Sequence, residues 1–105
     1  MAKFLFSASY TQAGIQGAVR EGFGSREAYI KGLVESAGGR MEVFYWAYGK
    51  DDVIVVIDAE PASAIAISMA INQSGAVKLT TTPLLTSAEM DQARAKLPQY
   101  RAPGT

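Results

Sequence analysis

Residues 53–57 form an unbroken run of β-branched apolar residues, Val-Ile-Val-Val-Ile, between Asp52 and Asp58. β-branched side chains favour extended backbone, and successive side chains of a strand point to opposite faces of a sheet. A strand that is apolar on both faces must be covered on both faces. We therefore expect residues 52–58 to be a central strand of a sheet.

Three further strands are predicted: residues 3–10 and 77–82 place different side chains on their two faces by alternation, and residues 41–48 form a strand that is mostly apolar on both faces. A short turn at residues 49–51 joins 41–48 to the central strand as a hairpin. Pro83 closes the last strand, which makes that strand an edge strand. In the second strand we expect one face to carry Met41, Val43, Tyr45 and Ala47 and the other to carry Glu42, Phe44, Trp46 and Tyr48.

Helix start and stop residues separate these strands. The predicted helices begin at the caps Thr11 and Ser25, at Pro61 and at the capping box of Thr86, and they end near Arg20, Gly38, Gln73 and Leu97. Gly14 and Gly17 weaken the first helix by about 1 kcal/mol each relative to alanine. The third helix carries Ile65 and Met69 on one side and Ile67 and Ile71 on the other, so we expect it to be buried all round.

The order β-α-β-β-α-β predicts an α+β, ferredoxin-like fold with an antiparallel four-stranded sheet, plus a C-terminal helix. We expect one domain over residues 1–98, followed by a tail at 99–105. Right-handed crossover connections place both main helices on one face of the sheet.

This arrangement leaves one sheet face without helices, although the strands are apolar on both sides. The side chains at issue are Phe4, Phe6, Phe44, Trp46, Val53, Ile54, Val55 and Val56. Because an apolar face of this size is rare on a monomer, we expect a homodimer formed through the sheet face. The alternative is that the C-terminal helix folds across that face.

The composition excludes several classes of catalytic chemistry and of binding partner. The chain of 105 residues has no cysteine and no histidine, which removes thiol chemistry, Ser-His-Asp catalysis and the commonest metal ligands. Ten basic residues balance ten acidic ones, so we expect no nucleic-acid and no membrane partner. We expect no cofactor and no metal, and the absence of an export signal or a spanning segment favours a cytoplasmic, bacterial-type protein.

Several segments resemble one known family. They are residues 6–11, Gly38-Gly39, residues 44–49, Asp52-Val53, residues 72–77 and residues 81–86. They are similar to the GYD domain family, small ferredoxin-like proteins related in architecture to dimeric α/β barrels. Gly49 and Asp52 fit the Gly, Tyr, Asp signature, whereas Asp51 stands at the tyrosine position. The resemblance implies the fold and a dimeric α/β barrel type of assembly, and it implies no settled activity.

The candidate ligand-binding residues are Tyr10, Arg26, Trp46, Tyr48 and Asp52. Aromatic side chains offer shape and a polar tip, and a carboxylate orients a polar group or acts as a base. Arg26, with Arg20, flanks a glycine break where a helix N-terminus could bind an anion. The alternative is structural: aromatics in a core or interface, an aspartate in a turn and two solvated arginines.

Three functions follow from these residues. The first is a small-molecule binding or regulatory module with an apolar cavity inside a homodimer. The second is a cofactor-independent enzyme on an activated aromatic or quinone-like substrate, with Tyr10 or Asp52 positioning the proton. The third is single-stranded RNA binding on the open sheet face, with Phe4, Phe6, Phe44 and Trp46 stacking on bases. The neutral charge balance disfavours the third.

Overall fold

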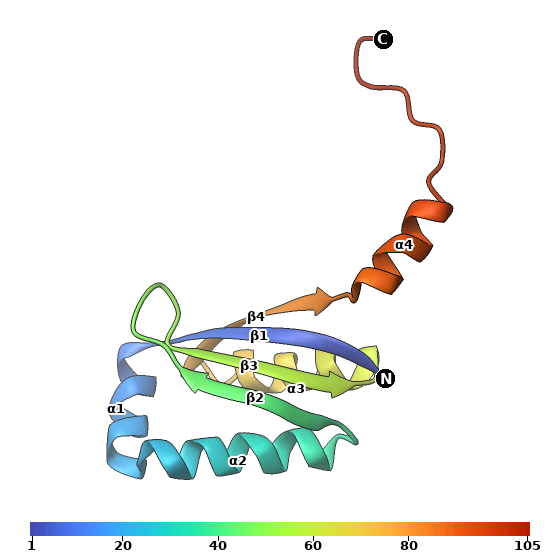
Figure 1. Cartoon of the computed structure of the whole chain (residues 1–105). Coiled ribbons are helices and arrows are strands. Elements are labelled where there is room, and N and C mark those ends of the chain that lie inside the picture. Colours follow the sequence, from blue (N-terminus) through green and yellow to red (C-terminus); the bar gives the residue numbers. More distant parts are fainter.

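The β-branched run forms an inner strand of the sheet, as predicted. The computed structural model describes all 105 residues, and its elements are β1 (Ala2–Tyr10), α1 (Gln12–Glu21), α2 (Phe23–Ser36), β2 (Arg40–Trp46), β3 (Val53–Ala59), α3 (Pro61–Asn72), β4 (Val77–Leu84) and α4 (Ser87–Ala95). The four strands form one sheet in the order β2-β3-β1-β4, and all neighbours are antiparallel (Figure 1). This α+β arrangement is the predicted ferredoxin-like layout.

Helices α2 and α3 lie along the same face of the sheet, and α1 stands at the sheet end where β1 finishes (Figure 1). The core is the layer between this face and the two long helices. Its buried residues are Phe4, Phe6, Ala8, Val34, Val53, Val55, Ile57, Ala59, Ala64, Ile67 and Leu79. We call this side of the sheet the helix face and the other side the open face.

Helices α1 and α2 follow each other with a single residue between them. Thr11 caps α1 as predicted, and its side-chain oxygen accepts a hydrogen bond from the backbone N–H of Gly14 at 3.1 Å. Gly22 has a φ of 101°, a conformation that favours glycine, so the chain changes direction within one residue. As a result α2 begins at Phe23, and the predicted cap Ser25 lies inside the helix.

Strand β2 contains a β-bulge that sequence alternation did not predict. Met41 pairs with Ile57, but the next paired residue, Val43, pairs with Val56. An extra residue in one strand reverses the faces of the residues that follow it. Met41 therefore shares the helix face with Phe44 and Trp46, and the predicted grouping of Met41 with Val43 and Tyr45 is wrong.

Helix α3 is buried on one side only, contrary to the prediction. Ala64 and Ile67 face the sheet and are buried, whereas Ile65 and Met69 are 48% and 61% exposed. The helix forms the outer layer of the domain, and no other element of the chain covers its far side (Figure 1).

Strand β4 continues to Leu84, two residues beyond its predicted end. Pro83 therefore lies inside the strand, opposite Phe4 of β1. A proline is tolerated there because β4 is an edge strand and has a neighbour on one side only.

The C-terminal helix does not cover the open face, so the alternative in which it folds across that face is wrong. Helix α4 has the predicted Thr86 capping box, but none of its residues is buried, and it projects away from the sheet (Figure 1). The chain consequently extends 56 Å along its longest axis. No helix of the chain has the length and apolar character needed to cross a membrane.

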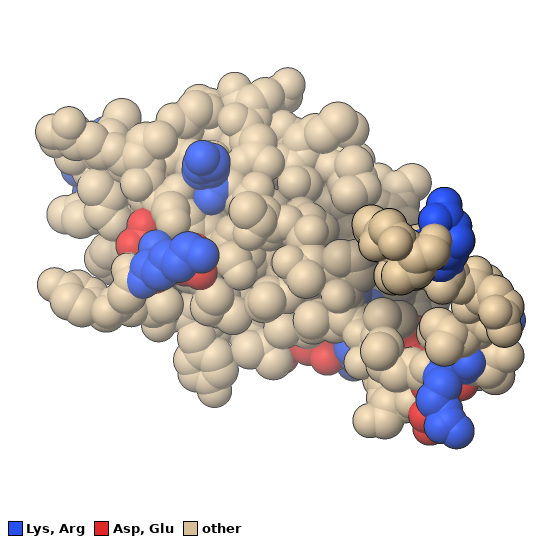
Figure 2. Space-filling view, turned by 90° about the horizontal axis from the view of Figure 1, so that it is seen from above, with Lys and Arg blue, Asp and Glu red and all other residues tan.

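The open face is less aromatic than predicted. Phe4 and Phe6 are buried on the helix face, and Phe44 and Trp46 pack against the same core. The strand registers leave the open face with a central apolar patch of Leu5, Val43, Tyr45, Ile54 and Val56. Figure 2, which looks onto this face, shows a broad uncharged surface with few charged side chains.

A charged cluster closes one end of the open face. The Asp58 carboxylate accepts hydrogen bonds from Lys3 Nζ at 3.0 Å and from Arg40 Nη2 at 2.8 Å, and both cations also pair with Glu42. The neighbouring Glu42 carboxyl, followed by the Arg40 and Lys3 donors, holds the pKa of Asp58 well below its usual range. These cross-strand pairs fix the relative positions of β1, β2 and β3.

Candidate functional site

A cavity of about 660 Å³ lies on the helix face, between α1, α2, α3 and the adjoining ends of β1 and β4. This volume is within the range of small-molecule sites. The lining is mostly apolar and comes from residues Tyr10, Ala13, Gly14, Gly17, Ala18, Arg20, Glu21, Arg26, Tyr29, Ile30, Leu33, Ala70, Ile71, Ser74, Ala76 and Val77. Segments that are distant in the sequence thus meet around one hollow.

Helix α1 closes one end of the cavity because its first turn rests on the chain just before β4. Thr11 donates a backbone hydrogen bond to the carbonyl oxygen of Ala76 at 3.0 Å. A Cβ atom on Gly14 would lie 1.9 Å from the same oxygen, so only glycine permits this approach. The sequence showed Gly14 as a weak point of the helix, and its role in close packing was missed.

The C-terminal end of α3 is fixed to β4 by one side chain, which sequence reasoning also missed. Asn72 Oδ1 accepts a hydrogen bond from the Leu79 N–H at 2.7 Å, and Asn72 Nδ2 donates one to the Leu79 carbonyl at 3.1 Å. The amide therefore satisfies both backbone groups of a residue in the edge strand. This pair holds the α3 wall of the cavity, with Ile71 and Ser74, in place.

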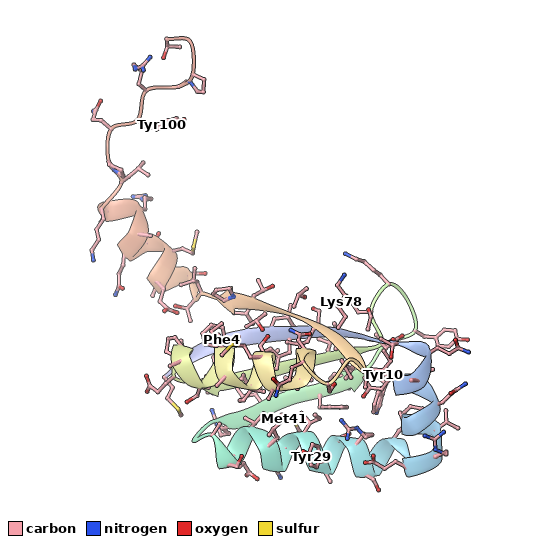
Figure 3. All side chains as sticks on the ribbon, turned by 180° about the vertical axis from the view of Figure 1, so that it is seen from behind. Phe4, Tyr10, Tyr29, Met41, Lys78 and Tyr100 are labelled. Carbon is pink, nitrogen blue, oxygen red and sulfur yellow. The ribbon has the colours of Figure 1, made fainter.

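Two of the five candidate residues, Tyr10 and Arg26, line the cavity. Tyr10 ends β1 and lies beside α1 on the helix side of the sheet, while Tyr29 lies on α2 (Figure 3). Trp46 meets the Tyr10 ring edge to face, with centroids 6.0 Å apart, and it packs in the same manner on Phe23 and Phe44. Trp46 is outside the lining and supports the Tyr10 ring from the sheet.

Asp52 and Tyr48 are not part of the cavity wall. Asp52 Oδ2 accepts a hydrogen bond from the backbone N–H of Tyr10 at 2.8 Å, which fixes the end of β1. Tyr48 lies in the hairpin turn and is fully exposed. The structure therefore brings Tyr10, Arg26, Trp46 and Asp52 together at one end of the sheet. Tyr48 points into solvent and is not part of this group.

Arg26 is a charged residue within the mostly apolar lining. It also lines a narrow inner chamber of about 30 Å³, whose other walls include Phe6, Phe44 and Val55. Its side chain is 24% exposed, and its nearest acidic atom, Oε1 of Glu21, lies 3.6 Å from Nη1. The guanidinium also stacks on Tyr29, 5.1 Å from the ring centroid. Arg20 lines the same cavity at its exposed rim.

The cavity offers groups that can bind a ligand: apolar side chains, tyrosine hydroxyl groups and guanidinium donors. The acidic residues form no cluster of three or more that could hold a metal ion. Asp52, the carboxylate singled out as a candidate base, already accepts a hydrogen bond from the backbone N–H of Tyr10.

The family model described as the GYD domain matches residues 4–93, which covers every element that surrounds the cavity. Comparison with the curated proteins and with the solved structures gave no match. The family match spans most of the chain and agrees with the ferredoxin-like order of its strands. This chain belongs to the GYD domain family.

Proposed function

We propose that this protein is a small-molecule binding module and that its ligand occupies the cavity between α1, α2 and α3. One observation carries the proposal: a 660 Å³ hollow with a mostly apolar lining contains a partly buried arginine and two tyrosines. Apolar walls with a few polar groups that orient a ligand are typical of small-molecule sites.

The contacts that shape the cavity support this proposal. Gly14 and Asn72 fix α1 and α3 to the same stretch of chain, residues 76–79. The walls are therefore set by backbone contacts that form on folding. A preformed site loses little conformational entropy when a ligand enters.

The third candidate function, RNA binding, loses the residues on which it depended. Phe4 and Phe6 lie beneath the helices, and Phe44 and Trp46 pack against the same core. None of these rings is available to stack on bases at the open face.

We also propose that the protein is a homodimer through the open face. The patch of Leu5, Val43, Tyr45, Ile54 and Val56 has no cover from its own chain, and Tyr45 is 71% exposed. Threonine and serine side chains of β4 and β1 continue this uncharged surface, as Figure 2 shows. A second sheet with the same surface is a complementary partner for such a face.

Native mass spectrometry tests the binding proposal. We expect gently purified protein to carry one small molecule per subunit, and we expect Ala70→Trp to remove it because Ala70 lines the cavity. Ala62→Trp is the matched control, since Ala62 is an exposed residue of the same helix outside the lining. Equal retention of the ligand by both variants would contradict the proposed site.

A further inference from the structure

The side chain of Arg26 has no hydrogen-bonding partner within the protein. Its side chain is about three-quarters buried, yet its closest acidic contact, with Glu21 at 3.6 Å, is beyond hydrogen-bonding distance. Glu21 is itself 44% exposed, so water screens this pair. Arg26 lines the cavity and no protein acceptor occupies its guanidinium donors, so these donors are available to a ligand in the hollow.

The lining carries a net positive charge. Arg20 and Arg26 are cationic, and Glu21 is the one acidic residue of the wall. The other large side chains around the hollow are apolar or aromatic, namely Tyr10, Tyr29, Ile30, Leu33, Ile71 and Val77. A neutral apolar ligand would leave the guanidinium donors without acceptors.

From these observations we infer that the ligand is a hydrophobic carboxylate: an apolar, ring-sized body among the side chains of α2 and α3, with its carboxylate on Arg26. The inference rests on the proposed binding function and adds the ligand class to it. Guanidinium offers two parallel N–H donors to the two oxygens of a carboxylate. The Tyr29 ring that stacks on Arg26 holds the fork in position.

Calorimetric titration with 1-naphthoate and its neutral analogue 1-naphthamide tests the ligand class. We expect 1-naphthoate to bind at least about tenfold more tightly than 1-naphthamide. Arg26→Gln removes this preference and leaves 1-naphthamide binding unchanged, and Arg26→Lys retains part of it. Arg94→Gln on α4, which lies outside the lining, changes neither affinity.

Each other outcome has a clear meaning. Equal affinities in the native protein, a preference that survives in Arg26→Gln, or loss of both ligands in that variant overturns the carboxylate inference and leaves the binding function standing. Absence of binding by either probe to the native protein overturns both.

A second inference comes from α4, independently of the cavity. Met90, Ala93 and Leu97 are spaced so that they line one side of this helix and its C-terminal end, and Met90 and Leu97 are 55% and 79% exposed. A nine-residue helix is too short to be stable without packing. Its own chain supplies none, because no residue of α4 is buried.

The geometry points to a second copy of this chain as the partner of α4. The helix begins three residues after Leu84, which pairs with Lys3 at the margin of the open face, so α4 follows directly from the edge of the proposed dimer surface. With strands ~4.8 Å apart and a rise of ~3.3 Å per residue, the sheet face covers roughly 500 Å² in projection. A stable interface takes about 800 Å² of accessible surface from each partner, and the exposed apolar residues of α4 add to the accessible surface that the sheet face offers.

Analytical ultracentrifugation of full-length variants tests whether α4 contributes to the dimer interface. We expect Met90→Glu with Leu97→Glu to weaken dimerisation at least about tenfold, because two charges enter an apolar contact. Gln92→Glu with Gln99→Glu adds the same charge at polar positions and leaves the dissociation constant unchanged. A native dimer that tolerates the first pair overturns the role of α4 alone, whereas a monomeric native protein overturns the dimer as well.

Discussion

The carboxylate of Asp52 binds the backbone N–H of Tyr10, with 2.8 Å between Oδ2 and the nitrogen. The backbone N–H of Asp52 in turn donates to the carbonyl of Ala8 at 2.8 Å. These two bonds carry the pairing of β1 and β3 beyond the last ladder pair, Ala8 with Val53. They fix the point at which the chain leaves the sheet, so that the Tyr10 ring lies against Trp46 at the cavity.

Replacement of Asp52 by alanine is expected to reduce stability by about 1–3 kcal/mol, because the Tyr10 N–H loses its acceptor. Asp51→Ala removes a neighbouring carboxylate that makes no hydrogen bond with its side chain, and we expect no measurable change from it. Urea unfolding of both variants measures the difference. Equal stabilities would contradict the role assigned to Asp52.

Two glycines of α1 should respond to alanine in opposite ways. Gly14→Ala places a Cβ 1.9 Å from the Ala76 carbonyl oxygen, so α1 must move away, and we expect a loss of about 1–3 kcal/mol. Gly17 has only the tip of the Arg20 side chain within 4 Å, at 3.9 Å. Gly17→Ala should therefore stabilise the helix by up to about 1 kcal/mol. Thermal unfolding measures the stability of both variants. A destabilised Gly17→Ala together with an unchanged Gly14→Ala would contradict the close contact assigned to Gly14.

The sequence predicted the elements well because their signals are local. Thr11, Pro61 and Thr86 open helices as expected, and residues 53–57 lie in an inner strand. The bulge between Met41 and Val43 was unpredictable because it depends on pairing with β3. It places Met41 on the helix face with Phe44 and Trp46, so the predicted grouping of Met41 with Val43 failed.

The dimer proposal predicts that a charge within the apolar patch of the open face separates the subunits. Tyr45→Asp places a carboxylate within the exposed patch, and we expect the mass in solution to fall to that of one chain. Tyr48→Asp is the control because Tyr48 is exposed in the hairpin turn, beyond the end of β2. Light scattering measures both masses. A dimer that persists in Tyr45→Asp would exclude this face.

Trp46 does not serve as a probe of that interface. It faces Phe23 and Tyr10 on the helix side, so Trp46→Asp would disturb the core rather than the open face.

Acid unfolding should depend on Asp58. Because its neighbours lower the pKa of Asp58 in the folded protein, its ionised form stabilises the fold above the ordinary carboxyl pKa. This contribution decreases as the pH falls below that range toward the lowered pKa. Asp58→Asn should therefore unfold with a shallower pH dependence below about pH 4.

Asp91→Asn is the control for this titration, since Asp91 is an exposed residue of α4 without an ion pair. Thermal unfolding followed from neutral to acidic pH gives both profiles. An Asp58→Asn profile that runs parallel to the native one would show that the charged cluster does not contribute.

The candidate site was only partly predictable. Tyr10 and Arg26 stood out as residue types suited to binding, and both line the cavity. Gly14 and Asn72 shape it through contacts with Ala76 and Leu79 that the alternation and capping patterns do not encode. Tyr48 was chosen for its chemistry, and its place in an exposed turn follows from the length of the hairpin.

The central claim is that small molecules enter the hollow between the three helices, and amide chemical-shift mapping tests it most directly. During titration of ¹⁵N-labelled protein with 1-naphthoate and, separately, 1-naphthamide, we expect the resonances of Gly17, Ile30 and Ala70 to move. Those of Ser7, Tyr45 and Thr80 on the open face should stay in place. Shifts confined to the open face, or no shifts with either probe, would contradict the claim.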